Sequence, residues 1–424
     1  MRLKKVDRYF YLLGAYIVIL HLCPFLGLLN MLPGGKPAYI VDTCTILPII
    51  LAMSYIFTSA TKAKMNYLDY AVLSYLIISI LSVLLYLQPD NPSDMVSYFY
   101  GLHHFVLPIF LYFAVKSINF NKQYSLLRFI FYLNIAAVVI GIILFFWRPD
   151  FYQAKLRADF VAAGMELEDW QIFGRMQSYL GSTALGSIIS TSLVLLIVLN
   201  FQKKQMVIFL PILTLGVLLT SQRGGFIAAL IALIYTFIKI RGGIGIKIVL
   251  PITTLLFLFL GLTYYLQIEP DSLNRLFNKY SLNSLIESFN IGETRGYKPG
   301  FSYIQDYPMG VGLGATSSIA DSMGLAKRGQ VVDANFMRIF ADLGIVGLLS
   351  FLVVLGAATR ASFKRENGFG WFLLFGLIAA ICIGTNTLDS YYVSHSFWIY
   401  LGVIGTKSMR KIVPKIEFTG GKPI

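Results

Sequence analysis

The sequence predicts an all-α polytopic membrane protein, and three observations carry this prediction. Of the 424 residues, 57% are hydrophobic and only 13% are charged, whereas soluble domains carry about 25% charged residues. The mean hydropathy is +0.70. Apolar runs long enough to cross a bilayer recur along the whole chain, so we predict about 12 transmembrane helices. We also expect a small helical cap outside the membrane, built from the two longest connections.

The apolar runs divide the chain into spans and connections. In chain order the expected spans are 9–29, 39–60, 68–87, 95–115, 125–147, 178–200, 205–220, 224–238, 244–266, 336–358, 370–387 and 391–406. The runs at 205–220 and 224–238 are short, and we expect tilted or partly re-entrant segments there. The expected parts of the chain are therefore N-terminal spans (1–147), a first outer loop (148–177), central spans (178–266), a large outer loop (267–335) and C-terminal spans with a tail (336–424).

Lysine and arginine indicate which connections face the cytosol. They recur in every second connection, for example at Lys203 and Lys204, and in both terminal segments, whereas 88–94 and 388–391 contain none. Cytosolic loops carry an excess of Lys and Arg, so we expect both termini in the cytosol. The net charge of +14 follows largely from this bias. It predicts contact with anionic membrane lipid and no nucleic-acid partner.

Four arginines that accompany the candidate motifs are expected at the outer side of the membrane, against this pattern. They are Arg175, Arg223, Arg295 and Arg338. Fixed positive charge at that side calls for a partner, and a large anion such as phosphate or pyrophosphate fits best. The two outer loops are also long enough to be functional. We therefore expect the chemistry of this protein at its outer face.

The motif around Arg223 carries the clearest phosphate signal. It reads Thr220-Ser-Gln-Arg-Gly-Gly-Phe226 and joins an outgoing span to a returning one. A helix that starts at Gly224 would present unpaired N–H groups to an anion, and the glycines would let it approach the backbone. The guanidinium adds a planar fork that matches phosphate oxygens. The alternative is a hairpin turn in which the arginine only extends its charged group into water.

The second motif combines Arg295 with the glycine-rich run from Pro308 to Gly314. Its glycines, Gly310, Gly312 and Gly314, allow a backbone to approach a ligand closely. A glycine-rich stretch alone is weak evidence for a site, and the alternative is a plain loop.

Further polar residues stand at the outer mouth of the span that starts near 336. Asp333 either caps this helix or takes part in catalysis, and Asn335 follows it. Asp342 lies four residues after Arg338. The two residues therefore either pair on one helix face or act directly. Arg175 precedes a helix start rich in small residues, and an interfacial anchor is its alternative role.

These segments, in this order, resemble the O-antigen polymerase and O-antigen ligase superfamily of bacterial membrane glycosyltransferases. The resemblance covers the second half of the chain, and its matching positions are Arg175, Ser221–Gly224 with one inserted Gln, Arg295, Pro308–Gly314 and Asp333–Gly347. Each motif is weak alone, and the ordered set is more specific. The resemblance implies a fold similar to that of glycosyltransferases of the C type.

The resemblance also implies a reaction and its participants. A growing glycan on undecaprenyl pyrophosphate would be transferred to a lipid-linked repeat unit at the periplasmic face of the bacterial inner membrane. A chain-length regulator protein is a further partner that the resemblance implies. No metal ion or other cofactor is expected. No cluster of residues has metal-ligand spacing, and arginines can supply the positive charge that stabilises the leaving group.

Site roles follow from the same resemblance. The residues expected to bind the pyrophosphate are Arg223, Arg295, Arg175, Arg338, Gly224 and Gly225. The candidate catalytic bases are Asp333, Glu293 and His395. The positions expected to contact acceptor or glycan are Gly310, Gly312, Gly314 and Asn335.

One departure distinguishes two activities within the family. Ligases typically carry His-Asn where this chain has Asp333-Ala334, and polymerases more often have Asp there. We therefore expect a polymerase of O-antigen, capsule or exopolysaccharide, with a ligase that acts on lipid A core as the alternative. A transporter or flippase of lipid-linked oligosaccharide is the rival from another class. Apart from Arg338 and Asp342, charge is confined to the membrane faces, which weighs against transport.

Overall fold

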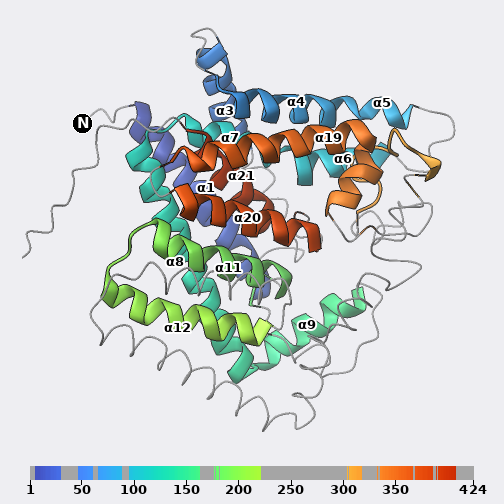
Figure 1. Cartoon of the computed structure of the whole chain (residues 1–424). Helices are drawn as coiled ribbons and strands as arrows, with labels where there is room; N and C mark the ends of the chain where they lie inside the picture. The colour runs from blue at the N-terminus through green and yellow to red at the C-terminus, as the bar shows by residue number, and fades with distance from the viewer. Residues whose placement is uncertain are drawn as a thin grey trace, which may run out of the picture.

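The computed structural model describes residues 5–29, 46–60, 65–87, 95–162, 176, 178–180, 182–220, 303, 305–317, 332, 335–365, 368–384, 388 and 390–406. Every regular element in these ranges is a helix, as the sequence predicts (Figure 1). In chain order the elements are α1 (Lys5–Leu28), α3 (Ile46–Ala60), α4 (Tyr67–Leu81), α5 (Val83–Tyr86), α6 (Met95–Gly101), η2 (Leu102–Val106), α7 (Ile109–Lys116), α8 (Phe120–Trp147), α9 (Asp150–Ala162), α11 (Ser182–Val198), α12 (Lys203–Thr220), α19 (Asn335–Phe363), α20 (Gly368–Gly384) and α21 (Tyr391–Gly405).

Several of these helices have the length and composition of membrane spans. Within the described ranges, five stretches are long and apolar enough to cross a bilayer: Arg8–Leu28, Tyr67–Tyr86, Met95–Lys116, Phe120–Trp147 and Asn335–Phe363. Shorter apolar helices occupy Ile46–Phe57, Ala184–Val198 and Lys204–Val217. The expected spans 224–238 and 244–266 lie outside the described residues. The full count of about 12 spans and the periplasmic cap therefore stay predictions.

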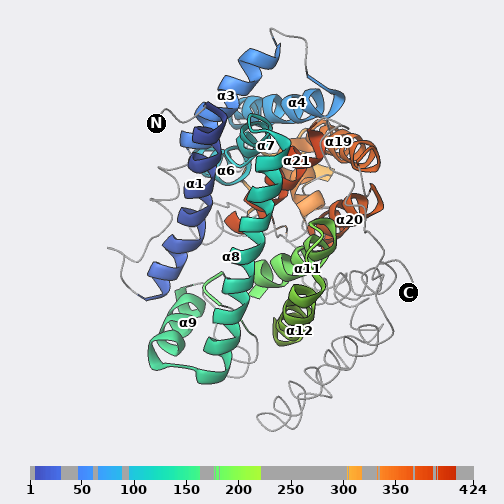
Figure 2. The same ribbon diagram turned by 90° about the vertical axis from the view of Figure 1, so that its left-hand side faces the viewer.

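The described helices form successive layers (Figure 1). α19 packs along α4 on one side and α20 on the other, and α11 connects α20 to α12. α8 crosses these layers lengthwise and also contacts α1 (Figure 2). At its far end α8 leads into α9, where Tyr152 and Leu156 pack against Leu144 and Leu28. The first outer loop of the sequence prediction thus contains a helix of 13 residues.

Two expected spans are irregular where the sequence suggested continuous helix. The Ser82 hydroxyl donates to the carbonyl of Ser79 at 2.7 Å, and α4 ends there before the short α5 begins. Such bonds compete with the helical ladder. In the span 95–116, Pro108 has no N–H to continue the ladder, and the N–H of Leu107 donates five residues back to Leu102. This π-turn is η2.

α19 is broken near its N-terminal end, and the break matters for the site. Gly344 has φ +67, outside the helical region, so two helical pieces meet at that residue. The carbonyls before the break and the N–H groups after it lose their helical partners. Buried backbone groups need replacement partners, and a second segment of the chain supplies them.

Candidate functional site

The glycine-rich segment 305–317 supplies the backbone partners that α19 lacks. The N–H of Val311 donates to the carbonyl of Ala341 at 2.9 Å, and the N–H of Gly312 donates to that of Asp342 at 2.8 Å. In return, the N–H of Ile345 donates to the carbonyl of Pro308 at 3.2 Å. The segment therefore hydrogen bonds to the backbone of α19 on both sides of the break and packs as part of the helix bundle.

Glycine is required where this segment passes the break. Gly310 has φ +91, and a Cβ there would lie 2.5 Å from the carbonyl oxygen of Asp342. Gly314 has φ +87, and a Cβ there would lie 2.5 Å from the carbonyl oxygen of Ser97 in α6. L-residues rarely adopt such angles, and no side chain fits in so little space. The glycines thus hold α6 and α19 against one loop, and their expected contact with a glycan stays a prediction.

The Asp342 carboxylate fastens the same segment from the side. Its Oδ2 accepts from the N–H of Gly314 at 2.9 Å. Its Oδ1 accepts from the N–H of Thr316 at 3.0 Å and from the Thr316 hydroxyl at 2.8 Å. Hydrogen bonds to a charged group contribute about 1.5–3 kcal/mol each. The sequence left two roles open for Asp342, and the structure shows a third: the carboxylate clamps the glycine segment to α19.

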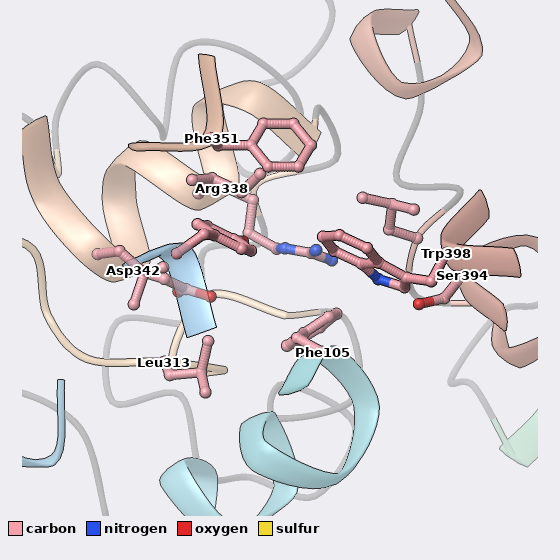
Figure 3. A pocket seen from close by; sticks show the side chains of 11 residues that line it. Phe105, Leu313, Arg338, Asp342, Phe351, Ser394 and Trp398 are labelled. Atoms are coloured by element: carbon pink, nitrogen blue, oxygen red, sulfur yellow. The ribbon is translucent and has the colours of Figure 1, made fainter. Parts of the chain in front are cut away.

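Arg338 lies one helical turn before Asp342 and lines a cavity with it. The Arg338 side chain is only 2% exposed, and its Cζ lies 3.9 Å from the centroid of the Phe105 ring. In Figure 3 the guanidinium extends from α19 into the space between Phe105 and Trp398. Desolvated cation–π contacts are worth about 2 kcal/mol, and a guanidinium so placed acts on charge more strongly than it would in water.

The cavity is lined by side chains from several helices. They are Tyr75, Phe105, Leu313, Arg338, Ile339, Asp342, Leu343, Phe351, Leu388, Ser394 and Trp398. Its walls are mainly apolar, with Arg338, Asp342 and Ser394 as the polar groups. Ligand sites commonly combine an apolar wall with a few convergent polar groups. This cavity is therefore a candidate site in the described part of the chain.

Histidines surround this region without entering its lining. His103 and His104 lie on the π-turn η2, beside Phe105. The His104 ring stacks on Tyr100 with centroids 4.2 Å apart. His395, a candidate base, is buried in α21 next to Ser394, with its ring centroid 5.9 Å from that of Tyr16. π-turns often occur at functional sites. The proline in this apolar run was the only sequence signal for η2.

Several predicted site residues lie outside the described residues. They are Arg175, Arg223, Gly224, Gly225, Glu293, Arg295 and Asp333. The shared arginine cluster and the assignment of the base therefore stay predictions.

Described residues next to these positions nevertheless come together. The N–H of Met176, the residue after Arg175 in the sequence, donates to the carbonyl of Leu219 in the last turn of α12 at 2.8 Å. The N–H of Val332 donates to the carbonyl of Thr316 at 3.2 Å, beside the Asp342 clamp. Asn335 is buried at the start of α19.

The sequence missed the partners that build the site. Phe105 looked like one aromatic among many in an apolar span, and Thr316 followed the glycine run without a motif of its own. Tyr75 and Trp398 likewise belong to ordinary spans. Within the described ranges, no group of three or more His, Cys, Asp or Glu side chains could hold a metal ion.

A protein-family model matches the part of the chain that contains this site. No curated protein matches the chain. Residues 206–352 match the family model described as O-antigen ligase. The match includes the whole glycine segment, the break in α19, Arg338 and Asp342. It supports a membrane glycosyltransferase-like enzyme of the polymerase or ligase type. The resemblance is thereby confirmed: the segment that carries the candidate site is similar to the O-antigen ligase family of this superfamily.

Proposed function

We propose that this protein is a polymerase of O-antigen, capsule or exopolysaccharide. It would transfer a growing glycan from undecaprenyl pyrophosphate to a lipid-linked repeat unit at the periplasmic face of the bacterial inner membrane. One observation carries the proposal furthest: a buried guanidinium, that of Arg338, lines a mainly apolar cavity inside the segment that matches the family.

The proposed reaction exchanges one bond at the anomeric carbon. The bond from this carbon to the pyrophosphate oxygen breaks, and a bond to an acceptor hydroxyl oxygen forms. The acceptor proton passes to a base of the protein, and undecaprenyl pyrophosphate leaves with the electron pair of the broken bond. Negative charge therefore grows on the phosphate oxygens as the sugar becomes cationic, and preorganised donors at the leaving group give the largest expected effect.

Arginines would supply those donors. We assign Arg223 and Arg295 to the pyrophosphate, with Gly224 and Gly225 at the helix start beside it. Arg175 and Arg338 would give supporting contacts or bind the second lipid. The planar guanidinium fork matches phosphate oxygens, and burial such as that of Arg338 strengthens its pull on charge.

A base must reach the acceptor hydroxyl. Asp333 is the first candidate, because it follows Val332, which hydrogen bonds to Thr316 beside the Asp342 clamp. Glu293 and His395 are the other candidates. General bases act within about 3.2 Å of the proton they take, or through one water.

A ligase that moves glycan to lipid A core is the second candidate, because the matching family model carries that description. The Asp333-Ala334 pair, in place of His-Asn, favours the polymerase. A flippase remains the rival from another class, and elongation by the purified protein without transport would argue against it.

A complementation experiment tests the function. In a strain that lacks the gene, Arg338→Ala and Arg223→Ala should each reduce chain elongation by about 10²–10³-fold, the usual cost of removing one charge-stabilising donor. Arg157→Ala is the matched control, since Arg157 is exposed on α9 at the same expected face and lies outside the cavity lining. A polymerase defect leaves single repeat units on the core, whereas a ligase defect leaves the core bare. Normal long chains from both variants would contradict the site.

The same assay in purified form addresses the metal and the partners. Elongation of lipid-linked repeat units without core lipid separates a polymerase from a ligase. EDTA should leave the rate unchanged, because arginines carry the charge work; a loss that a divalent ion restores would contradict metal independence. Added chain-length regulator should change the length distribution and leave the linkage intact.

A further inference from the structure

The opposite end of α19 carries a second buried guanidinium. Arg365 follows the last residue of this helix, Phe363, by two positions, and its side chain is only 7% exposed. Its Nε, Nη1 and Nη2 are buried, and none has a hydrogen-bond partner among the described residues. A buried charge without partners is costly, so a group that satisfies these donors is expected.

The protein surrounds this charge with aromatic rings. The Cζ of Arg365 lies 5.1 Å from the ring centroid of Phe120 and 5.7 Å from that of Trp371. These rings attract a cation but accept no strong hydrogen bonds. Burial lowers the pKa of Arg365 to about 10, so the side chain is still charged at neutral pH. The rings thus hold the guanidinium in place and leave its donors for another partner.

A helix start adds a second source of positive potential. α20 has 17 residues and begins at Gly368, three positions after Arg365, with Trp371 in its first turn. The N–H groups of a first turn have no helical acceptors, and the dipole places positive charge there. α19 also ends here, and its carbonyls would favour a cation. In the described structure, however, the backbone N–H groups of Lys364 and Arg365 bond to it, at the carbonyls of Ala361 and Ser362, and the Arg365 guanidinium does not.

The surrounding surface identifies the kind of anion. Arg360 and Lys364 are exposed beside Arg365, and the large side chains of Phe363 and Phe369 are exposed next to them. Aromatic rings and basic residues together are typical of the membrane interface, where headgroups lie beside the ends of acyl chains. The sequence places this end of α19 at the cytosolic face. A phospholipid fits this surface, because its phosphate matches the basic residues and its acyl chains match the exposed aromatic side chains.

We propose that Arg365 and the first turn of α20 bind the phosphate of an anionic phospholipid at the cytosolic face. The guanidinium and the positive end of the α20 dipole attract the phosphate oxygens, and Phe363 and Phe369 contact the acyl chains. This site is separate from the cavity at Arg338 and does not depend on the proposed glycosyl transfer.

A lipid titration tests the site on the full-length protein in detergent. The probe is phosphatidylglycerol, with phosphatidylcholine and inorganic phosphate as comparison arms, and binding is followed by native mass spectrometry and by thermal unfolding. Phosphatidylglycerol should bind and raise the unfolding temperature more than phosphatidylcholine. Arg365→Gln should weaken its binding about 10- to 100-fold, because bonds from a charged group to phosphate are lost. Lys204→Gln, on another exposed cytosolic connection, is the matched control and should bind as the unaltered protein does.

Two further variants separate the loss of lipid contacts from the loss of fold or of local charge. Arg365→Lys keeps the charge without the planar fork, so it should fold and show an intermediate affinity even if Arg365→Gln does not fold. Glu366→Gln removes the negative charge that follows Arg365 in the sequence and should therefore not weaken lipid binding. Equal phosphatidylglycerol affinity in Arg365→Lys, Arg365→Gln and the unaltered protein would overturn the proposal. So would full protection by inorganic phosphate alone, which would identify a free-phosphate site instead.

Discussion

Two buried carboxylates near opposite ends of the helix bundle show how the same group serves two purposes. Asp69, at the start of α4, forms an ion pair with Lys116 and accepts from the Tyr112 hydroxyl at 2.7 Å. Its other oxygen accepts from the N–H of Asn66 at 2.8 Å in a capping box. Asp342, in α19, is held by the N–H groups and hydroxyl of the glycine segment.

The difference lies in what each carboxylate does with the nearby cation. At Asp69 the ammonium of Lys116 forms an ion pair with the carboxylate. This pair joins α4 to α7. At Asp342 neutral donors satisfy the carboxylate, and Arg338, one turn earlier, lies over Phe105 in the cavity. We call the Asp69–Lys116 pair the lock, because its cation pairs with a carboxylate inside the protein, and the Arg338 cavity the site, because its cation lines a cavity. This contrast predicts that damage to the first affects stability and damage to the second affects activity.

The largest expected effect is at the lock. Lys116→Met leaves the Asp69 carboxylate buried without its cation, and such a loss costs about 3–5 kcal/mol of stability. Thermal unfolding in detergent should show a large drop in midpoint, while the elongation rate per folded molecule changes little.

The double variant Lys116→Met/Asp69→Asn is the control for this prediction. Replacing both charges removes the unpaired group, so most of the lost stability should return. If Lys116→Met abolished elongation with an unchanged unfolding midpoint, the contrast between lock and site would be wrong.

The contrast also shows what could be predicted from sequence. Hydropathy located most of the described helices, because a bilayer demands long apolar runs, and the order of motifs predicted the similarity to the O-antigen ligase family. The i to i+4 spacing placed Arg338 and Asp342 together. The clamp itself joins Asp342 to Gly314 and Thr316, and the aromatic floor under Arg338 comes from Phe105 in a distant span. Such contacts depend on tertiary packing and leave no local pattern in the chain.

A smaller effect is expected where the glycine segment meets α6. Gly314→Ala puts a Cβ 2.5 Å from the carbonyl oxygen of Ser97 at a positive φ, so loop or helix must shift. Strain of this kind costs about 1–3 kcal/mol, and the shift displaces the segment held by Asp342. We expect elongation to fall more steeply than the unfolding midpoint.

Gly356→Ala tests whether this effect belongs to the site. Gly356 lies in α19, and a Cβ there meets nothing within 4 Å. Alanine in a helix interior is favoured over glycine by about 0.5–1 kcal/mol. The midpoint should therefore rise slightly with unchanged elongation, and equal losses in both variants would show a general sensitivity of the chain to substitution.

The smallest predicted effects come from removing one hydroxyl from each carboxylate. Tyr112→Phe deletes the donor to Asp69, and Thr316→Val deletes the hydroxyl donor to Asp342. Each change costs about 1.5 kcal/mol, because the other donors remain. At Asp69 the cost should appear in the unfolding midpoint alone. At Asp342 it should appear mainly as shorter polysaccharide chains, since a looser clamp lets the segment beside Arg338 move. Thr316→Ser keeps a hydroxyl and should restore chain length, and a Thr316→Val variant with lowered midpoint and full-length chains would make Asp342 a second lock.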